Sequence, residues 1–152
     1  MLDVGERAPE FALPDERGET VRLSDLLNGG PVVLFFYPMD FSPACTAQAC
    51  SMRDLRDELA EAGYRPVGIS GQSQSSHARF DRRHELGYTL LADEGRKVAR
   101  AYGALTFGVW PRRVTFVIGA DGVVRDRVVA DVRVGRHAEF VRRLAAGEAS
   151  GS

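Results

Sequence analysis

Apolar residues along the chain form short runs that alternate with segments of helical pattern. The most apolar run, residues 32–37 (VVLFFY), has no polar position, which is typical of a strand buried on both faces of a sheet. A second buried strand is predicted at residues 65–70. Between them, residues 44–62 carry apolar side chains at helical spacing, and Gly63 is a suitable end. The pattern therefore predicts a strand, helix, strand unit with parallel strands.

The segments on either side extend this alternation. Residues 5–27 indicate two short extended pieces around a turn at 16–18, then a brief helix capped by Ser24. After the second strand, Ser75 or Ser76 can cap a helix that reaches Leu86, and the strand YTLLAD leads into a helix at residues 96–102. We expect an α/β fold in which helices cover both faces of a mixed sheet.

The last third of the chain predicts an antiparallel addition to the sheet. The sequence RRVTFVIGADGVVRDRVV contains two β-rich runs about an Ala-Asp-Gly turn, and residues 136–144 have the pattern of an amphipathic helix. The final residues, GEASGS, favour a flexible tail at 147–152. Residues 1–146 are thus predicted to form a single domain, as expected for a chain of 152 residues.

Composition excludes several classes of function. Apolar residues make up 44% of the chain, but no stretch approaches the roughly 20 apolar residues of a membrane span. The acidic N-terminus does not resemble a signal peptide, so a cytoplasmic location is expected. The net charge is −1, and arginines alternate with acidic residues. Neither membrane nor nucleic-acid binding is predicted.

The chain has two cysteines, and both lie in the segment DFSPACTAQAC after the first buried strand. Ser42 followed by Pro43 is the pattern of a helix start, which puts Cys45 in the first helical turn. Unpaired N–H groups and the positive end of the helix dipole favour a thiolate there. Cys45 shares the buried face of the predicted helix, whereas Cys50 lies about 140° away from it. Cys45 is thus placed as a nucleophile and Cys50 as a later reactant.

Three other interpretations of the cysteines agree less well with the sequence. A buried cysteine is most often a small core residue, but the second cysteine and the capped helix start argue against that role here. A zinc site needs three or four ligands, and His77, His84 and His137 are scattered singly, as surface or helix-face residues would be. A thioredoxin-type exchanger has its second cysteine three residues after the first, where this chain has Gln48.

The segment PMDFSPAC resembles the active-site pattern of the peroxiredoxin family (AhpC/TSA), with Pro38, Ser42 and Cys45 at the matching positions. The continuation CTAQAC is similar to the Q-type members, also called bacterioferritin comigratory proteins, in which a resolving cysteine follows five residues later. Segments from residue 5 to residue 144 look like family segments in family order. The resemblance implies a thioredoxin-like fold with an N-terminal extension. It also implies reduction of hydrogen peroxide or organic hydroperoxides, without cofactor or metal.

Roles for individual residues follow from this resemblance. Cys45 would be the peroxidatic cysteine, which becomes a sulfenic acid, and Cys50 the resolving cysteine that forms a disulfide with it. Ser42 would hydrogen-bond the thiolate and the peroxide, although a simple helix cap is an alternative that can coexist with that role. Pro38 would shield the sulfur from water, the alternative being a proline that ends a strand.

Arg113 matches the active-site arginine of the family. In such a fold its strand runs antiparallel to residues 32–37, which brings its start beside the cysteine loop. Strand alternation puts Arg113 on the same face as Thr115 and Val117 and turns Arg112 the other way. Two residues depart from the family pattern: Ser42 replaces the usual threonine, and Gln48 replaces the usual glutamate, although a glutamine still accepts a hydrogen bond.

Two further functions remain as alternatives to a thiol peroxidase. The same disulfide could serve a non-enzymatic peroxide sensor or redox switch, which would react once with peroxide instead of turning over. A reductase of protein disulfides is disfavoured by Gln48. For the peroxidase, the expected partners are a hydroperoxide and thioredoxin or a similar dithiol, and the expected state is a monomer or weak homodimer.

Overall fold

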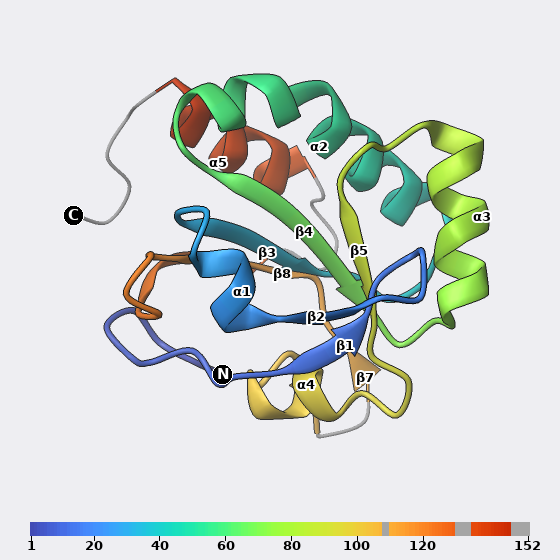
Figure 1. Ribbon diagram of the computed structural model, residues 1–152, viewed down its shortest axis with the longest axis horizontal. Coiled ribbons are helices and arrows are strands. Elements are labelled where there is room, and N and C mark those ends of the chain that lie inside the picture. Colours follow the sequence, from blue (N-terminus) through green and yellow to red (C-terminus); the bar gives the residue numbers. More distant parts are fainter. Residues whose placement is uncertain (108–109, 130–134, 147–152) are drawn as a thin grey trace.

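A five-stranded mixed sheet lies at the centre of the computed structural model (Figure 1). The structure describes residues 1–107, 110–129 and 135–146, so the predicted tail at 147–152 falls outside the described residues. The sheet order is β5-β4-β3-β8-β9. Strands β4 and β5 are parallel to β3, whereas β8 pairs antiparallel with β3 and β9 pairs antiparallel with β8. The strands are β3 (Val32–Phe36), β4 (Arg65–Ser70), β5 (Thr89–Ala92), β8 (Val114–Ile118) and β9 (Val124–Val129). The predicted α/β class and central strand are confirmed.

Helices cover both faces of the sheet because the buried strands alternate their side chains between two cores. In β3, Val33 and Phe35 face one core, and Leu34 and Phe36 face the other. Helices α2 (Pro43–Glu61) and α5 (Gly135–Ala145) lie side by side on the first face, while α1 (Leu23–Leu27) and α4 (Lys97–Ala101) lie on the second (Figure 1). Helix α3 (Gln74–His84) flanks β5 and contributes Phe80 to the first core.

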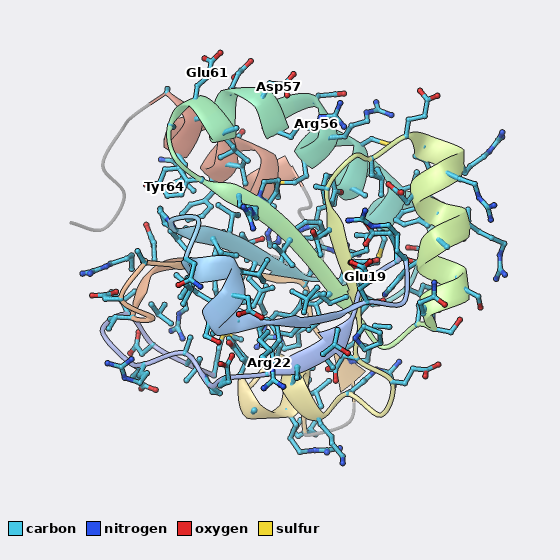
Figure 2. All side chains as sticks on the ribbon, in the orientation of Figure 1. Glu19, Arg22, Arg56, Asp57, Glu61 and Tyr64 are labelled. Atoms are coloured by element: carbon cyan, nitrogen blue, oxygen red, sulfur yellow. The ribbon has the colours of Figure 1, made fainter. Side chains whose placement is uncertain are left out.

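Helix α2 carries both cysteines, and its sequence explains where it begins and which face it buries. Ser42 is the N-cap and Pro43 the first helical residue, as predicted. Met52, Leu55 and Leu59 are buried against the sheet, as the helical pattern indicated. The opposite side is charged, and Asp57 and Glu61 point outward from the helix (Figure 2). After the helix, Gly63 takes a positive φ of 91°, which glycine adopts without steric cost.

Two predicted helix caps are wrong. Helix α1 begins at Leu23, and the carboxylate of Glu10 accepts the Ser24 N–H at 3.1 Å, so a side chain distant in sequence replaces the predicted Ser24 cap. Helix α3 is capped by Ser73, whose Oγ accepts the Ser76 N–H at 3.2 Å, not by Ser75 or Ser76. The run SQSSH offers several caps of equal local quality, so contacts elsewhere in the fold decide among them.

The short outer strands complete the fold. Strands β1 (Ala12–Pro14) and β2 (Thr20–Arg22) pair antiparallel around the predicted turn. A two-residue ladder between β6 (Leu105–Thr106) and β7 (Trp110–Pro111) has no counterpart in the sequence prediction. Within the described part of the chain, every helix is too short or too polar to cross a lipid bilayer.

Candidate active site

Both cysteines lie on the continuous helix α2 as free thiols. Cys45 occupies the first turn and is 1% exposed, whereas Cys50 is half-buried. The Ser42 Oγ accepts the main-chain N–H of Cys45 at 3.3 Å and lies 3.5 Å from the Met39 carbonyl oxygen. The predicted helix start and the predicted difference in burial between the two thiols are therefore confirmed. Ser42 acts here as a helix cap, and its contact is with the main chain of Cys45.

Arg113 is the charged side chain that contacts the Cys45 sulfur. Its Nη1 lies 3.2 Å from Cys45 Sγ, and the residue is only 5% exposed. Antiparallel pairing of Phe36 with Val114 brings the start of β8 to the end of β3, where the cysteine loop begins. The predicted placement of Arg113 beside Cys45 is confirmed. Arg112 is half-buried, and its main-chain N–H binds the Ala104 carbonyl oxygen.

Gln48 contacts the arginine that lies beside the sulfur. It lies one helical turn after Cys45, is 3% exposed, and its Oε1 accepts a hydrogen bond from Arg113 Nη1 at 2.8 Å. The amide thus supplies the acceptor that the sequence prediction allowed for glutamine, without a negative charge. Its Nε2 has no hydrogen-bond partner among the residues that the structure describes. A buried amide donor is therefore left without a hydrogen bond one helical turn after Cys45.

The loop of residues 38–42 joins β3 to α2, and Pro38 is its first residue. Pro38 is half-buried and follows the buried Tyr37, two residues after β3 ends at Phe36. Its shielding of the sulfur stays a prediction. Phe41, later in the loop, takes a positive φ of 66°, which is uncommon for a residue with a bulky side chain. Its ring rests on Phe80 of α3, with 5.1 Å between ring centroids.

A buried polar cluster next to this loop was missed by the sequence prediction. Asp40 accepts hydrogen bonds from Tyr37 Oη at 2.6 Å and Ser76 Oγ at 2.7 Å, and its Oδ2 lies 2.8 Å from His77 Nδ1. His77 is 0% exposed, so its interpretation as a surface or helix-face residue is wrong. His137 is also buried and bonds Thr115 Oγ1 at 2.8 Å.

The ionisation states within this cluster follow from burial and hydrogen bonding. Burial alone would raise the pKa of Asp40, but the hydrogen bond and charge of His77, with bonds from Ser76 and Tyr37, hold that pKa below its ordinary value. Burial, and next the Asp40 carboxylate, raise the pKa of Tyr37 well above its usual value. Asp40 is therefore an acceptor, and the Tyr37 phenol a donor, at neutral pH.

The middle of α2 is tied to the segment between α3 and β5. Tyr88 Oη donates to the Ala49 carbonyl oxygen at 2.8 Å, and Arg53 Nη1 donates to the His84 carbonyl oxygen at 2.7 Å. Arg56 Nη1 donates to the Leu86 carbonyl oxygen at 2.7 Å, one turn further along. These contacts begin at Ala49, so the turn that holds Cys45 lies outside them.

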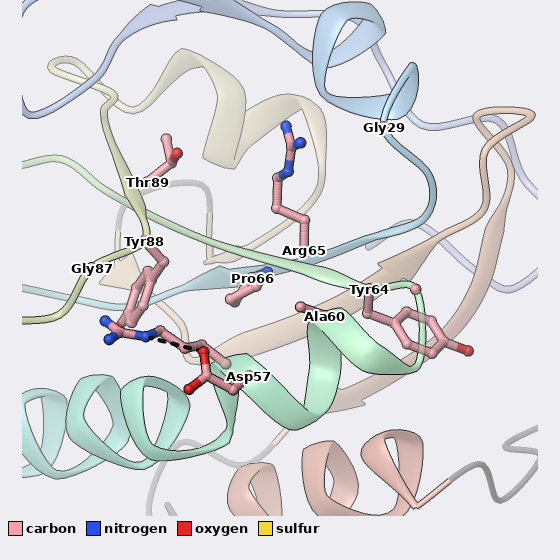
Figure 3. Close-up of a pocket in the computed structure, with 11 residues that line it drawn as sticks. Gly29, Asp57, Ala60, Tyr64, Arg65, Pro66, Gly87, Tyr88 and Thr89 are labelled. Carbon is pink, nitrogen blue, oxygen red and sulfur yellow. Dashed lines mark ion pairs between the residues drawn. The ribbon is translucent and has the colours of Figure 1, made fainter.

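A surface groove of about 450 Å³ lies at the opposite end of α2 (Figure 3). Its lining includes Asp57, Ala60 and Tyr64 from the end of α2 and the following turn, and Tyr88 just before β5. Neither cysteine lines the groove, so it has no part in the thiol site. Among residues 1–107, 110–129 and 135–146, no three His, Cys, Asp or Glu side chains gather as a metal site would need.

Comparison with known proteins identifies the family of this chain. Residues 4–127 match the model of the AhpC/TSA family. The chain belongs to that family. It is 46% identical over 123 residues to the chloroplastic peroxiredoxin Q of Suaeda salsa, which covers 80% of this chain and 57% of that relative. The chain therefore spans less than two thirds of the length of this curated relative.

Two solved structures show the same fold. The peroxidoxin BcpB of Mycobacterium tuberculosis superposes with a TM-score of 0.89 at 37% identity, covering 99% of this chain and all of that one. Peroxiredoxin Q of Xanthomonas campestris superposes with a TM-score of 0.82 at 26% identity, covering 92% of each chain. The predicted thioredoxin-like fold and the Q-type peroxiredoxin resemblance are confirmed.

Proposed function

We propose that this peroxiredoxin-family chain is a thiol-dependent peroxidase that reduces hydrogen peroxide and organic hydroperoxides. The observation that carries the proposal is the buried Cys45 at a capped helix start, with Arg113 Nη1 3.2 Å from its sulfur. A guanidinium and the positive end of a helix both stabilise a thiolate over a thiol. The half-buried Cys50 on the same helix supplies the second thiol that turnover needs.

In the first step the Cys45 thiolate attacks one oxygen of the hydroperoxide. The S–O bond forms as the O–O bond breaks, the sulfur is oxidised to a sulfenic acid, and the other oxygen leaves as water or an alcohol after taking up a proton. Arg113 can stabilise the charge on the sulfur and on the departing oxygen, since it is held in place by Gln48. The unbonded Nε2 of Gln48 and the hydroxyl of Ser42 are two further donors on the same helix start.

In the second step Cys50 attacks the sulfenic sulfur, forms the disulfide and releases water. Five residues along a regular helix separate the two Cα atoms by about 8–9 Å, whereas a disulfide needs less than about 7 Å. Because both cysteines lie on one continuous helix, the first turn or two of α2 must unwind for the bond to form. Reduction of the disulfide by a dithiol then allows the helix to form again.

The remaining parts of the proposal concern partners and location. The donor is thioredoxin or a similar dithiol protein, the protein is a monomer or weak homodimer, and the location is cytoplasmic. The family membership supports a dithiol donor, while the other two points rest on the sequence pattern and stay predictions.

The test is a coupled assay in which NADPH, thioredoxin reductase and thioredoxin regenerate the protein in the presence of hydrogen peroxide or an alkyl hydroperoxide. Continuous NADPH consumption that scales with protein concentration is expected. Glutaredoxin with glutathione, and an assay without donor, identify the reductant. Consumption of a single equivalent followed by arrest, with every donor, would indicate the alternative of a peroxide sensor.

A further inference from the structure

We propose that Asp40 and His77 form an anchor that holds the loop of residues 38–42 on helix α3 and thereby controls how readily the first turn of α2 opens. Both are positioning residues, because they touch the loop and not the sulfur. The proposal rests on the proposed peroxidase function for its kinetic consequences. Its structural part rests on the buried contacts alone.

Proton accounting shows that the contact is an ion pair. His77 Nε2 lies 3.0 Å from the Leu91 carbonyl oxygen, which has no hydrogen, so Nε2 must carry one. His77 Nδ1 lies 2.8 Å from Asp40 Oδ2, which also accepts a hydrogen bond from Ser76, so a proton must lie between these two atoms as well. Asp40 is ionised at neutral pH. The imidazole of His77 therefore carries both protons.

This ion pair joins three separate parts of the fold at one point. Asp40 belongs to the cysteine loop, two residues before the Ser42 cap, while His77 belongs to α3 and binds the main chain of β5. Both side chains are fully buried, so water does not weaken the pair. A second contact, the Phe41 ring on Phe80, joins the same loop to the same helix. The loop is thus fixed on α3 by two separate contacts.

The loop needs such an anchor because it contains a strained residue and precedes a turn that must open. Phe41 has a φ of 66°, a conformation that costs free energy and is retained only when its surroundings hold it. Releasing the loop would relax Phe41 and remove the support of the Ser42 cap. The folded first turn, in which Arg113 contacts Cys45, would then be less populated, and the open turn that lets Cys50 reach Cys45 would be more populated.

Loss of the anchor therefore changes the two chemical steps in opposite directions. Peroxide attack becomes slower because Cys45 spends less time beside Arg113, and disulfide formation becomes faster because Cys50 reaches the sulfenic acid sooner. A shorter-lived sulfenic acid is also less available to a second peroxide, so less sulfinic acid forms. A general loss of stability has no reason to produce this opposed pair of effects.

The experiment measures both steps in the full chain for Asp40→Ala and His77→Ala. Rapid mixing with hydrogen peroxide, acid quench and intact mass spectrometry give the rates of thiol loss and of disulfide formation. We expect thiol loss to slow about tenfold, as for a modest misplacement of a catalytic group, and disulfide formation to accelerate severalfold. Asp40→Asn should restore both rates toward wild type, because an asparagine N–H can donate to Nδ1 of a neutral His77 while its oxygen still accepts from Tyr37.

The control is Leu26→Ala, which empties a buried position in the core on the opposite face of the sheet. It should lower global stability without slowing thiol loss and accelerating disulfide formation at the same time. If the alanine variants do not fold, Ser76→Ala removes one bond to Asp40 and should shift both rates in the same directions by less. Unchanged rates, or two rates that fall together, would overturn the anchor.

A readout that needs no turnover separates this proposal from the proposed function. In the reduced chain, hydrogen exchange at residues 39–46 should be faster in His77→Ala than in wild type and unchanged there in Leu26→Ala. If exchange is faster in His77→Ala but the wild-type chain shows no peroxidase turnover, the anchor is supported and the proposed peroxidase function is contradicted. If exchange is equal in the two chains and the wild type is an active peroxidase, the anchor is contradicted and the peroxidase function is supported.

Discussion

The two parts of helix α2 are held in place in different ways. From Ala49 onward, the helix buries Met52, Leu55 and Leu59 and is tied by side-chain hydrogen bonds to the segment before β5. The first turn buries only Cys45 deeply and relies on the Ser42 cap and on Arg113. Burial of large apolar side chains contributes more to stability than a capped end or a single polar contact, so the first turn is the weaker part.

This difference fits what the proposed chemistry requires. The first turn has to be formed for Cys45 to meet Arg113 and has to open for Cys50 to approach. The contacts of that turn involve the sulfur itself, so oxidation of Cys45 alters them directly. Burial of Leu55 and Leu59 does not depend on the redox state of Cys45, so the later part of the helix can stay docked while the turns that carry the two cysteines rearrange.

Substitution of the cysteines tests the comparison most strongly. Cys45→Ser should abolish peroxidase activity, because no other thiol occupies the first turn beside Arg113. Cys50→Ser should leave the first step intact and block the disulfide, so one equivalent of peroxide yields a sulfenic acid that dimedone labels. The roles would be reversed if the Cys50 variant failed to react while the Cys45 variant still did.

Removal of the charge beside the sulfur has the next largest expected effect. Arg113→Met should slow peroxide attack roughly ten- to a hundredfold, since a buried hydrogen bond to a charged group is worth about 1.5–3 kcal/mol. Arg112→Met is the matched control and should change the rate much less. Equal losses in both variants would mean that the guanidinium at the sulfur is not what promotes attack.

Acid should weaken the loop that precedes the first turn. The pKa of Asp40 is lowered in the folded protein, so its ionisation stabilises the fold above the ordinary value of 3.8, and this contribution is lost as the pH falls through the lower folded pKa. The difference in free energy of unfolding between wild type and the double variant Asp40→Asn/His77→Gln, which has no ionisable group at either position, should be level at about pH 5 and shrink below 3.8. Urea unfolding between pH 3 and 5 measures it; a difference that grows in acid would contradict the assignment.

The sequence predicts the framework well because its signals are local. The run VVLFFY indicates a buried strand by itself, and Ser42-Pro43 marks a helix start within two residues. Arg113 could be selected over Arg112 because strand alternation and the family pattern agree. Each of these conclusions depends on neighbouring residues or on a quoted motif, and the structure confirms the placement that each implied.

What the sequence could not predict depends on contacts between distant segments. Asp40 and His77 are 37 residues apart, and no local sequence pattern marks either of them as buried. Tyr88 and Arg53 donate to main-chain carbonyl groups, so no complementary side chain appears in the sequence to indicate a partner. The same holds for Glu10, which replaces the predicted Ser24 cap. Buried polar groups are generally hydrogen-bonded, but this rule predicts a partner only for a residue whose burial is already known.

Hydrogen exchange in the two redox forms should locate the boundary between the parts of α2. Amides of residues 44–53 are expected to exchange faster in the disulfide form than in the dithiol form, because that bond cannot form on the intact helix. Beyond Leu55 the burial of the helix is unaffected by the disulfide, so little change is expected there. Equal protection in both forms would show that Cys50 does not resolve Cys45 within one chain.

The smallest expected effect, and the sharpest test of the boundary, comes from a single hydroxyl. Burial, and then the nearby Cys50 and Asp81, raise the pKa of Tyr88 well above its usual value, so its phenol remains a donor to the Ala49 carbonyl oxygen. Tyr88→Phe removes that bond and keeps the ring. A hydrogen bond of this kind is worth about 1 kcal/mol, so amides near residues 49–53 should exchange about fivefold faster in the dithiol form.

Tyr102→Phe is the matched control for this substitution, because Tyr102 Oη makes a similar bond, 2.7 Å long, to the Pro9 carbonyl oxygen. Tyr102 belongs to the core on the opposite face of the sheet, so the variant loses a comparable bond without contact to α2. Its exchange at residues 49–53 should match wild type. Faster exchange there in both variants would show that the middle of α2 responds to overall stability, and that the Tyr88 bond does not mark where the helix stops opening.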